Sequence, residues 1–394
     1  MASKPQLAPH EVRSVYLDAN ATTPLVSEVF NAMMPWFFSR AGNPSSSHVR
    51  GREAREAVET ARRQIAGLIK SRAKELVFTS GGTESDNLAI LGTVTEPGAH
   101  IVTSSIEHHA VLHAVQRLEQ RGSTATSLPV DERGQVNPDD VRRALQRNTR
   151  LISVMMANNE TGVLQPIEEI GRIARERDIL FHTDAVQAAA KVPIDVGKIS
   201  CDLLSISGHK MHGPQGTGAL FVRDGVKLDP LFHGGSHEFG LRAGTENVAG
   251  IVGFGQAAEI AQQGFHDGSV ARLKKFRDEL ERSVLLEAKD AGVNGAGSER
   301  VPNTTNLWFD GVEGVQLLSK LDDMGLSVSG GSACNADRCE PSHVLLAMGL
   351  SLRKANSSIR LSLSKQTTVE DIDFAIWQVS ETIERLRKCQ RTRK

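Results

Sequence analysis

The stretch Leu203-Leu-Ser-Ile-Ser-Gly-His-Lys210 predicts a short buried strand that ends in a turn carrying glycine, histidine and lysine. The chain continues through Met211-His-Gly-Pro-Gln-Gly-Thr-Gly218 into a second strand, 218–222. A lysine at the exit of a strand can be desolvated, which makes its amine usable as a nucleophile. Taken alone, however, such a lysine is more often a surface residue. A functional role for Lys210 therefore needs support from motifs elsewhere in the chain.

Strands and helices alternate on the N-terminal side of this stretch. Apolar runs predict strands at 75–80, 100–105, 151–156 and 179–184. Helical spacing of apolar residues, with a Pro at the first turn of one segment, predicts helices at 52–69, 110–121, 138–147 and 167–177. This alternation is typical of an α/β protein with a mostly parallel sheet between helices. In such a sheet, ligands bind beyond the carboxyl ends of the strands.

The pattern changes after about residue 256, where a long helix is expected at 269–291, shorter helices at 314–324 and 341–348, and a last helix at 368–389. We therefore expect a large domain at 16–255. Residues 256–394, together with 1–15, are expected to form a smaller α+β domain that carries a loop at 329–342.

Two other motifs fall at predicted strand ends, as Lys210 does. Asp184 ends the strand at 179–184, where a carboxylate could hold the pyridine nitrogen of pyridoxal 5'-phosphate (PLP) and keep its ring an electron sink. An aspartate there could equally cap a helix. Gly81-Gly82-Thr83 lies at a strand-to-helix turn, where backbone N–H groups can approach a phosphate, although many structural turns share this composition.

A series of short motifs in register extends this pattern over residues 15–375. The motifs are Tyr16-Leu-Asp-Ala-Asn20, Gly42-Asn-Pro-Ser-Ser-Ser-His48, Ser80-Gly-Gly-Thr-Glu84, Glu107-His108, Asn158-Asn-Glu-Thr-Gly162, Asp184-Ala-Val-Gln187, Ser207-Gly-His-Lys210, Gly240-Leu-Arg-Ala-Gly-Thr-Glu-Asn247, Ser332-Ala-Cys334 and Ile359-Arg-Leu-Ser362. Together they resemble the NifS/IscS-type (group I) cysteine desulfurases of the class V aminotransferase family. The resemblance implies the fold of fold-type I PLP-dependent transferases, with a seven-stranded sheet in the large domain.

The resemblance also implies a role for each matching residue. Lys210 would hold PLP as a Schiff base, and His108 would stack on the ring and serve as a possible acid or base. The ring would be contacted by Asp184 at the pyridine nitrogen and by Gln187 at the phenolic oxygen. The phosphate would be held by Gly82, Thr83, Ser207 and His209, and by Thr245 from the partner subunit of a homodimer.

Substrate binding follows from the same resemblance. Arg360 would hold the substrate carboxylate through its bidentate fork, which a lysine cannot copy. Asn159 would lie near the substrate carboxylate and the ring oxygen, and its choice over Asn158 rests on the alignment alone. Without the resemblance, His108 is typical of a helix start and Arg360 of a surface strand.

Cys334 lies in Ser329-Gly-Gly-Ser-Ala-Cys-Asn-Ala-Asp-Arg-Cys-Glu-Pro-Ser342, whose small and polar residues predict an exposed loop. The resemblance implies that Cys334 takes sulfur from L-cysteine as a persulfide and leaves L-alanine. The attacking form is the thiolate, and Arg338 is a candidate source of nearby positive charge. Cys339 departs from the family pattern, and it could be incidental, receive sulfur from Cys334, or form a disulfide or metal contact. No second Cys/His cluster accompanies the pair, so we expect no metal site.

Alternative functions remain open from the sequence. A selenocysteine lyase would share fold and cofactor, and an aminotransferase or decarboxylase of this fold would need no loop thiol. From another class, the chain could be a non-catalytic sulfur-relay or scaffold subunit, which would not need the combination of Lys210, Asp184, His108 and Cys334. The physiological acceptor is expected to be a protein, such as an iron–sulfur scaffold.

Composition limits partners and location. The chain has 394 residues, a formal net charge of −1 and four widely spaced cysteines. We therefore expect neither nucleic acid nor an anionic membrane as a partner, and no disulfide framework. No apolar run approaches the roughly 18 residues of a membrane span, and residues 1–18 lack the apolar core of a signal peptide. A reducing cytoplasmic setting is expected.

Overall fold

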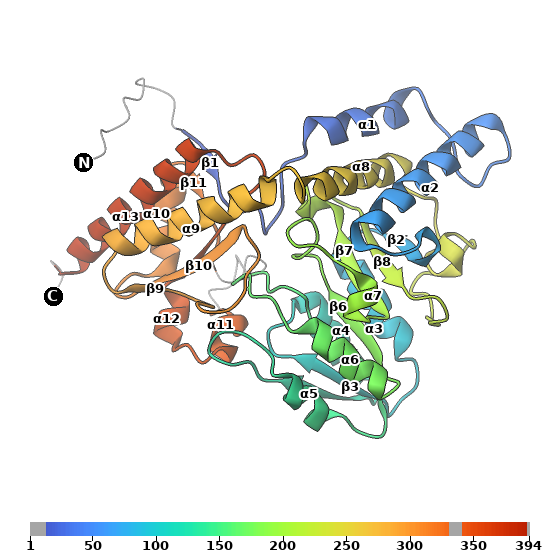
Figure 1. The fold of residues 1–394 in the computed structure, drawn as a ribbon, viewed down its shortest axis with the longest axis horizontal. Coiled ribbons are helices and arrows are strands. Elements are labelled where there is room, and N and C mark those ends of the chain that lie inside the picture. Colours follow the sequence, from blue (N-terminus) through green and yellow to red (C-terminus); the bar gives the residue numbers. More distant parts are fainter. Residues whose placement is uncertain (1–12, 331–340, 392–394) are drawn as a thin grey trace.

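A computed structural model describes residues 13–330 and 341–391 of the chain, and its centre is a seven-stranded sheet in the order β2-β8-β7-β6-β5-β3-β4 (Figure 1). Only β8 runs antiparallel to its neighbours, so the predicted mostly parallel sheet is confirmed. The strands are β2 (Leu76–Thr79), β3 (His100–Ser104), β4 (Thr124–Leu128), β5 (Thr149–Ser153), β6 (Leu180–Asp184), β7 (Leu203–Ser207) and β8 (Gly218–Val222).

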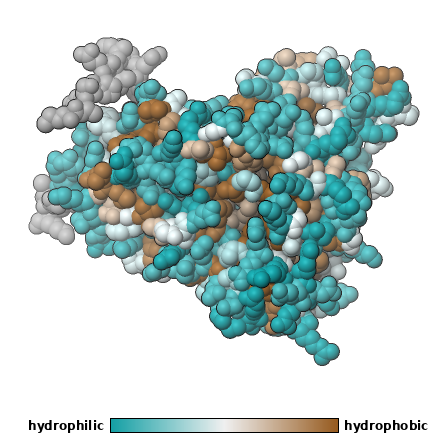
Figure 2. Space-filling view, in the orientation of Figure 1, coloured by the Kyte–Doolittle hydropathy of each residue, from teal (hydrophilic) through white to brown (hydrophobic). Residues whose placement is uncertain are grey.

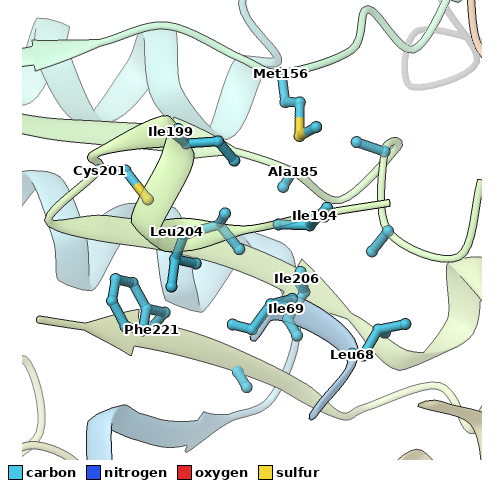
Figure 3. Packing of buried hydrophobic residues seen from close by; sticks show 14 of the residues in the cluster. Leu68, Ile69, Met156, Ala185, Ile194, Ile199, Cys201, Leu204, Ile206 and Phe221 are labelled. Atoms are coloured by element: carbon cyan, nitrogen blue, oxygen red, sulfur yellow. The ribbon is translucent and has the colours of Figure 1, made fainter. Parts of the chain in front are cut away.

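Helices cover both faces of the sheet because successive strand residues point to opposite sides. Leu204 and Phe221 pack toward one face, in the cluster that also holds the buried Cys201 (Figure 3). Leu203 and Leu220 pack toward the other face. The first face is covered by α2 (Val49–Ile69), α6 (Ile167–Glu176), α7 (Val196–Ile199) and α8 (Val248–Gly264), and the second by α3 (Gly82–Thr93) and α4 (His109–Glu119). Further helices of this part are α1 (Ser27–Phe38) and α5 (Pro138–Ala144).

The C-terminal part has a separate three-stranded antiparallel sheet, in the order β12-β10-β9, and its own apolar cluster. Near the N-terminus, β1 (Val15–Tyr16) pairs with β11 (Leu326–Ser327), which ties the start of the chain to this part. The division at 255/256 stays a prediction, and α8 continues across it. The remaining elements are β9 (Ala291–Val293), β10 (Thr304–Phe309), β12 (Ser358–Ser362), α9 (Ser269–Glu287), α10 (Gly314–Asp323), α11 (His343–Ala347), α12 (Leu352–Asn356) and α13 (Val369–Arg391).

The surface in Figure 2 is mostly hydrophilic, with small groups of hydrophobic residues between the polar ones. On α13, Arg385 and Lys388 form ion pairs with Glu381 and Glu384 one helical turn earlier. Across the described part of the chain, none of the helices has the length and apolar character needed to cross a membrane.

A buried ion pair ties α2 to the sheet and to the 3₁₀ turn Glu238–Gly240. Both terminal nitrogens of Arg62 donate to the Glu238 carboxylate at 2.7 Å, and the backbone N–H of Phe78 donates to the same carboxylate. The guanidinium carbon also lies over the rings of Phe78 and Phe239, 4.6 and 5.3 Å from their centroids. The pair therefore anchors the segment that leads to Thr245.

We expect Arg62→Ala to lower the free energy of unfolding by about 3–5 kcal/mol, because Glu238 would remain buried without its cation. Urea denaturation measures this change. Arg63→Ala, on the exposed side of the same helix, is the matched control and should change stability by less than about 0.5 kcal/mol. Equal stabilities of the two variants would contradict the anchoring role.

Candidate active site

A cavity of about 370 Å³ opens at the carboxyl ends of β6 and β7, in the range typical of small-molecule sites. It is where the rule for parallel sheets places ligands. Segments far apart in the sequence meet there, from residue 20 to residue 360. Of the site residues predicted from the sequence, it brings together Gly82, Thr83, His108, Asn159, Asp184, Gln187, Ser207, His209, Lys210 and Arg360.

Lys210 lies in the 3₁₀ turn Gly208–Lys210 that directly follows β7. Its Nζ donates to the backbone carbonyl oxygens of Asn20 and Ala21, each at 2.6 Å. These two acceptors belong to the segment after β1, so the N-terminal segment holds the amine at the cavity.

Asp184 is the last residue of β6 and is buried. Its Oδ1 accepts the backbone N–H of Val186 at 2.9 Å. Burial raises the pKa of Asp184 to about 6, although the hydrogen bond from Val186 and the charge of Lys210 oppose the rise. Asp86 of α3 also lines the cavity, and burial together with the charge of Asp184 raises the pKa of Asp86 well above its usual range. Asp86 and Asp184 together therefore favour one negative charge over two.

His108 is both a helix start and a cavity residue. Its Nδ1 accepts the backbone N–H of Ala110 at the N-terminus of α4, so the proton of the neutral ring lies on Nε2. Burial, with the positive charge of Lys210 and the neighbouring His109, lowers the pKa of His108 to about 4. The imidazole is therefore neutral at physiological pH.

The predicted phosphate residues surround the N-terminus of α3. Gly82 and Thr83 form its first turn, where backbone N–H groups and the helix dipole favour an anion. A Cβ atom at Gly82 would approach Cγ2 of Val186 to 2.8 Å, so a larger residue does not fit there. Ser207 ends β7, and the Nδ1 of His209 lies 3.1 Å from the hydroxyl of Thr22.

Arg360 is buried on β12, with 2% of its surface exposed. Its Nη2 donates to Asp18 at 2.6 Å and its Nη1 to the backbone oxygen of Asn159 at 3.0 Å. Its Nε is buried and has no hydrogen-bond partner among the described residues. A buried donor without a partner is costly, and at the wall of a cavity it points to an anionic ligand.

The two neighbouring asparagines have different surroundings. The side chain of Asn158 is used within its own turn, where Oδ1 accepts the backbone N–H groups of Glu160 and Thr161. Its Nδ2 donates to the backbone oxygen of Ile106. Asn159 lines the cavity, and Asn158 does not. The geometry therefore favours Asn159 as the residue that contacts a ligand.

Cys334, Cys339 and Arg338 lie outside the described residues, but the chain on both sides of residues 331–340 is at the cavity. The backbone of Ser329 exchanges hydrogen bonds with that of Arg360, at 3.1 and 2.7 Å. The Ser342 hydroxyl caps α11 and donates to Glu160 at 2.5 Å, and His343 lines the cavity. The described residues on both sides of the segment that carries Cys334 therefore lie beside the candidate site.

Thr245 is exposed on the segment after the 3₁₀ turn Glu238–Gly240 and does not line the cavity. Its contact with a partner subunit stays a prediction. Among the described cysteines, Cys201 is buried, and burial raises its thiol pKa to about 12, which makes it a poor nucleophile. Cys389 is exposed near the end of α13 and does not line the cavity.

Several cavity residues were not assigned a role from the sequence. Asn20 and Glu160 stand inside the motifs quoted above, so the motifs themselves carried the signal. Asp86 and His109 each lie two residues or fewer from such a motif, and His343 directly follows the loop. The full set without an earlier assignment is Asn20, Ala21, Asp86, His109, Met155, Ala157, Glu160, Val186 and His343.

Residues 15–374 match the family described as aminotransferase class-V. The chain belongs to the class-V aminotransferase family. Members of this family use PLP, so the chain is an enzyme of a PLP-dependent family.

Its relatives confirm the resemblance to the NifS/IscS type. It is 49% identical to a cysteine desulfurase IscS of Dictyoglomus turgidum, over 95% of this chain and 96% of that protein. It is 48% identical to a cysteine desulfurase IscS of Methanosarcina thermophila, over 96% and 94% of the two chains. A solved NifS-like protein, 36% identical, superposes with a TM-score of 0.88 over 94% of this chain and 100% of its own. The solved structure of SspA in complex with cysteine has 38% identity and a TM-score of 0.80, covering 90% of this chain and 100% of that one.

Proposed function

We propose that this chain is a PLP-dependent cysteine desulfurase, which converts L-cysteine to L-alanine and transfers the sulfur to Cys334 as a persulfide. The observation that carries the proposal is the meeting of Lys210, Asp184 and Arg360 in one cavity. An amine, a buried carboxylate and a buried guanidinium are the groups that bind PLP and an amino-acid substrate.

The residues of the cavity fit PLP. Asp184 is buried with a raised pKa, and a protonated ring nitrogen would supply the positive partner that its desolvated carboxylate favours. The first turn of α3, with Ser207 and His209, would hold the phosphate. His108 would stack on the ring, and Gln187 and Asn159 would lie near the ring oxygen.

When bound, PLP supplies an electron sink for the bond electrons released at the substrate's α-carbon. The Nζ of Lys210 would take the proton from that carbon, because the carbonyl oxygens of Asn20 and Ala21 hold the amine at the cavity. Arg360 would hold the substrate carboxylate, with Asp18 fixing the orientation of its guanidinium. The neutral His108 carries its proton on Nε2 and would act through that atom as a proton donor.

In the sulfur step, the Cys334 thiolate would attack the sulfur of the substrate. The new S–S bond forms as the carbon–sulfur bond breaks, and the carbon keeps the bonding electrons and takes a proton to give alanine. This assignment is supported by the chain on both sides of residues 331–340, which lies at the cavity, and by the unsuitability of Cys201.

The finer assignments rest on the same resemblance. We propose a homodimer in which Thr245 reaches the phosphate site of the partner subunit, and its exposure supports such a contact. A cytoplasmic location and a protein acceptor of the persulfide sulfur, such as an iron–sulfur scaffold, belong to the proposal as well.

The direct test is to incubate the purified protein with L-cysteine and to quantify alanine and sulfide. Stoichiometric alanine and sulfide in the presence of a thiol reductant are the expected products. Alanine from L-selenocysteine but none from L-cysteine would identify a selenocysteine lyase instead. No alanine from either substrate would indicate a non-catalytic subunit.

We expect Arg360→Lys to raise the KM for cysteine about 100-fold with a smaller change in kcat, because lysine lacks the fork that pairs with a carboxylate. Steady-state kinetics separates the two constants. Arg353→Lys, on an exposed arginine that pairs with Asp310, is the control and should leave both constants unchanged. An unaltered KM in Arg360→Lys would remove the carboxylate-binding role.

A further inference from the structure

Lys191 is a buried lysine beside the site that the proposed reaction does not use. The residue is 6% exposed and does not line the cavity of about 370 Å³. Its Nζ donates to Oε1 of Gln187 at 2.6 Å and to Oδ1 of Asn20 at 3.0 Å. Both acceptors belong to residues that line the cavity.

These contacts fix the orientation of two side-chain amides. A lysine nitrogen offers donors, and an amide NH₂ turned toward it at 2.6 Å would set donor against donor. The oxygen of Gln187 must therefore face Lys191. The nitrogen of Gln187 then faces the other way, where one of its N–H bonds donates to the backbone oxygen of Asn20 at 2.9 Å. The second N–H of that nitrogen remains for a ligand in the cavity.

Asn20 is fixed in the same way. Its Oδ1 accepts from Lys191, and its Nδ2 donates to the backbone oxygen of Asn159 and to the hydroxyl of Thr304. Its backbone oxygen accepts from Lys210 at 2.6 Å. Lys191, Gln187 and Asn20 therefore form one hydrogen-bonded unit that reaches the amine of Lys210.

The electrostatic cost of burying Lys191 indicates that this residue has a role beyond stability. A lysine is rarely buried because desolvation of its charge is costly. Burial, together with the positive charges of Lys210 and Arg360, lowers the pKa of Lys191 well below its usual range. In either protonation state its nitrogen must donate to the two amide oxygens, because neither oxygen carries a proton.

We propose that Lys191 is a positioning residue, which locks the Gln187 amide so that its N–H faces the place of the phenolic oxygen of PLP. The inference rests on the proposed function, since it concerns that cofactor. A reversed amide would set its carbonyl oxygen against an oxygen that carries negative charge. The lock therefore favours the anionic form of the ring oxygen.

The test is a pH titration of the visible absorbance of the bound cofactor in Lys191→Met. When Lys191 no longer orients Gln187, the phenolic oxygen of PLP loses the Gln187 N–H as a donor. The proton that this oxygen shares with the nitrogen joining PLP to Lys210 is then held more tightly. The midpoint should therefore move upward by about one pH unit, the worth of one hydrogen bond to a charged group. Lys198→Met, which removes an exposed lysine on α7, is the control and should leave the midpoint unchanged.

Loss of the Lys191 charge would move the midpoint in the same direction, so a double-mutant cycle with Gln187→Leu separates the two causes. If Lys191 acts through the amide, Lys191→Met causes no further shift in the Gln187→Leu background. A shift of equal size in both backgrounds would overturn the proposal, as would an unchanged midpoint in Lys191→Met alone.

If Lys191→Met does not fold, Lys191→Gln decides, because a neutral amide keeps a donor without the charge. A midpoint within a few tenths of a unit of wild type supports the lock, and a rise of about one unit overturns it. A wild-type protein without any chromophore would overturn the proposed function and this inference with it. A normal chromophore whose midpoint ignores Lys191 would overturn the inference alone.

Discussion

Lys210→Ala is expected to lose the covalent cofactor and to lower kcat for cysteine by at least about 1,000-fold, because one residue serves as both attachment point and base. Among the described residues, Lys210 is the only lysine that lines this cavity. Lys191 does not line it and donates to Gln187, which does. The variant should still fold, because Lys210 is only partly buried and the two carbonyl oxygens that it contacts, those of Asn20 and Ala21, belong to residues that line the cavity.

The measurement combines turnover with the absorbance of the protein after removal of free PLP. Lys198→Ala, on an exposed lysine, is the matched control and should retain colour and turnover. Turnover of Lys210→Ala within tenfold of wild type would show that the base is another residue.

Cys334→Ala is expected to abolish persulfide formation and to lower sulfide release by at least about 1,000-fold. The thiolate is the nucleophile in the proposed step, and alanine offers no replacement. Binding of cysteine should persist, because Arg360 and Asn159 are unaffected. A spectral change on addition of cysteine, without release of alanine, would show this separation.

Cys339→Ala is the matched control in the same segment and retains Cys334. Trapping of the persulfide followed by peptide mass mapping identifies the thiol that carries the sulfur. Sulfur on Cys339 in wild type, lost in Cys334→Ala, would show relay from one cysteine to the other. Unchanged turnover in Cys334→Ala would refute the acceptor assignment.

The buried strands of the large sheet could be predicted because both their faces are apolar. The stretch Leu203–Ser207 is buried throughout, and so is Gly218–Val222. The edge strand Thr124–Leu128 could not be predicted in this way, because four of its five residues are exposed or partly exposed. Its place in the sheet depends on backbone pairing with β3.

One helix of the large domain and the end of another could not be predicted from the sequence. Val248–Gly264 was not predicted, because its glycines disfavour a helix in isolation. One reason for them is close packing, since a Cβ atom at Gly255 would approach the Cα of Ala61 in α2 to 2.6 Å. The helix predicted to end at residue 291 ends at Glu287, where the chain turns into β9.

The candidate site was predictable where it follows strand ends, as Asp184 and Lys210 do. Lys191 was not, because its function depends on contact with Asn20, which is 171 residues away in the sequence. The Nε of Arg360, which has no hydrogen-bond partner among the described residues, is likewise a property of the assembled cavity and not of the strand Ser358–Ser362. Local patterns locate strand ends, and the contacts between distant segments appear only in the fold.

The central claim is that Lys210 carries PLP, and borohydride reduction of the purified protein followed by peptide mass mapping tests it most directly. Reduction fixes the cofactor to the lysine that holds it. We expect the mass of reduced PLP on the peptide that contains Lys210. An unmodified Lys210, with the cofactor on Lys191 or on no lysine, would contradict it.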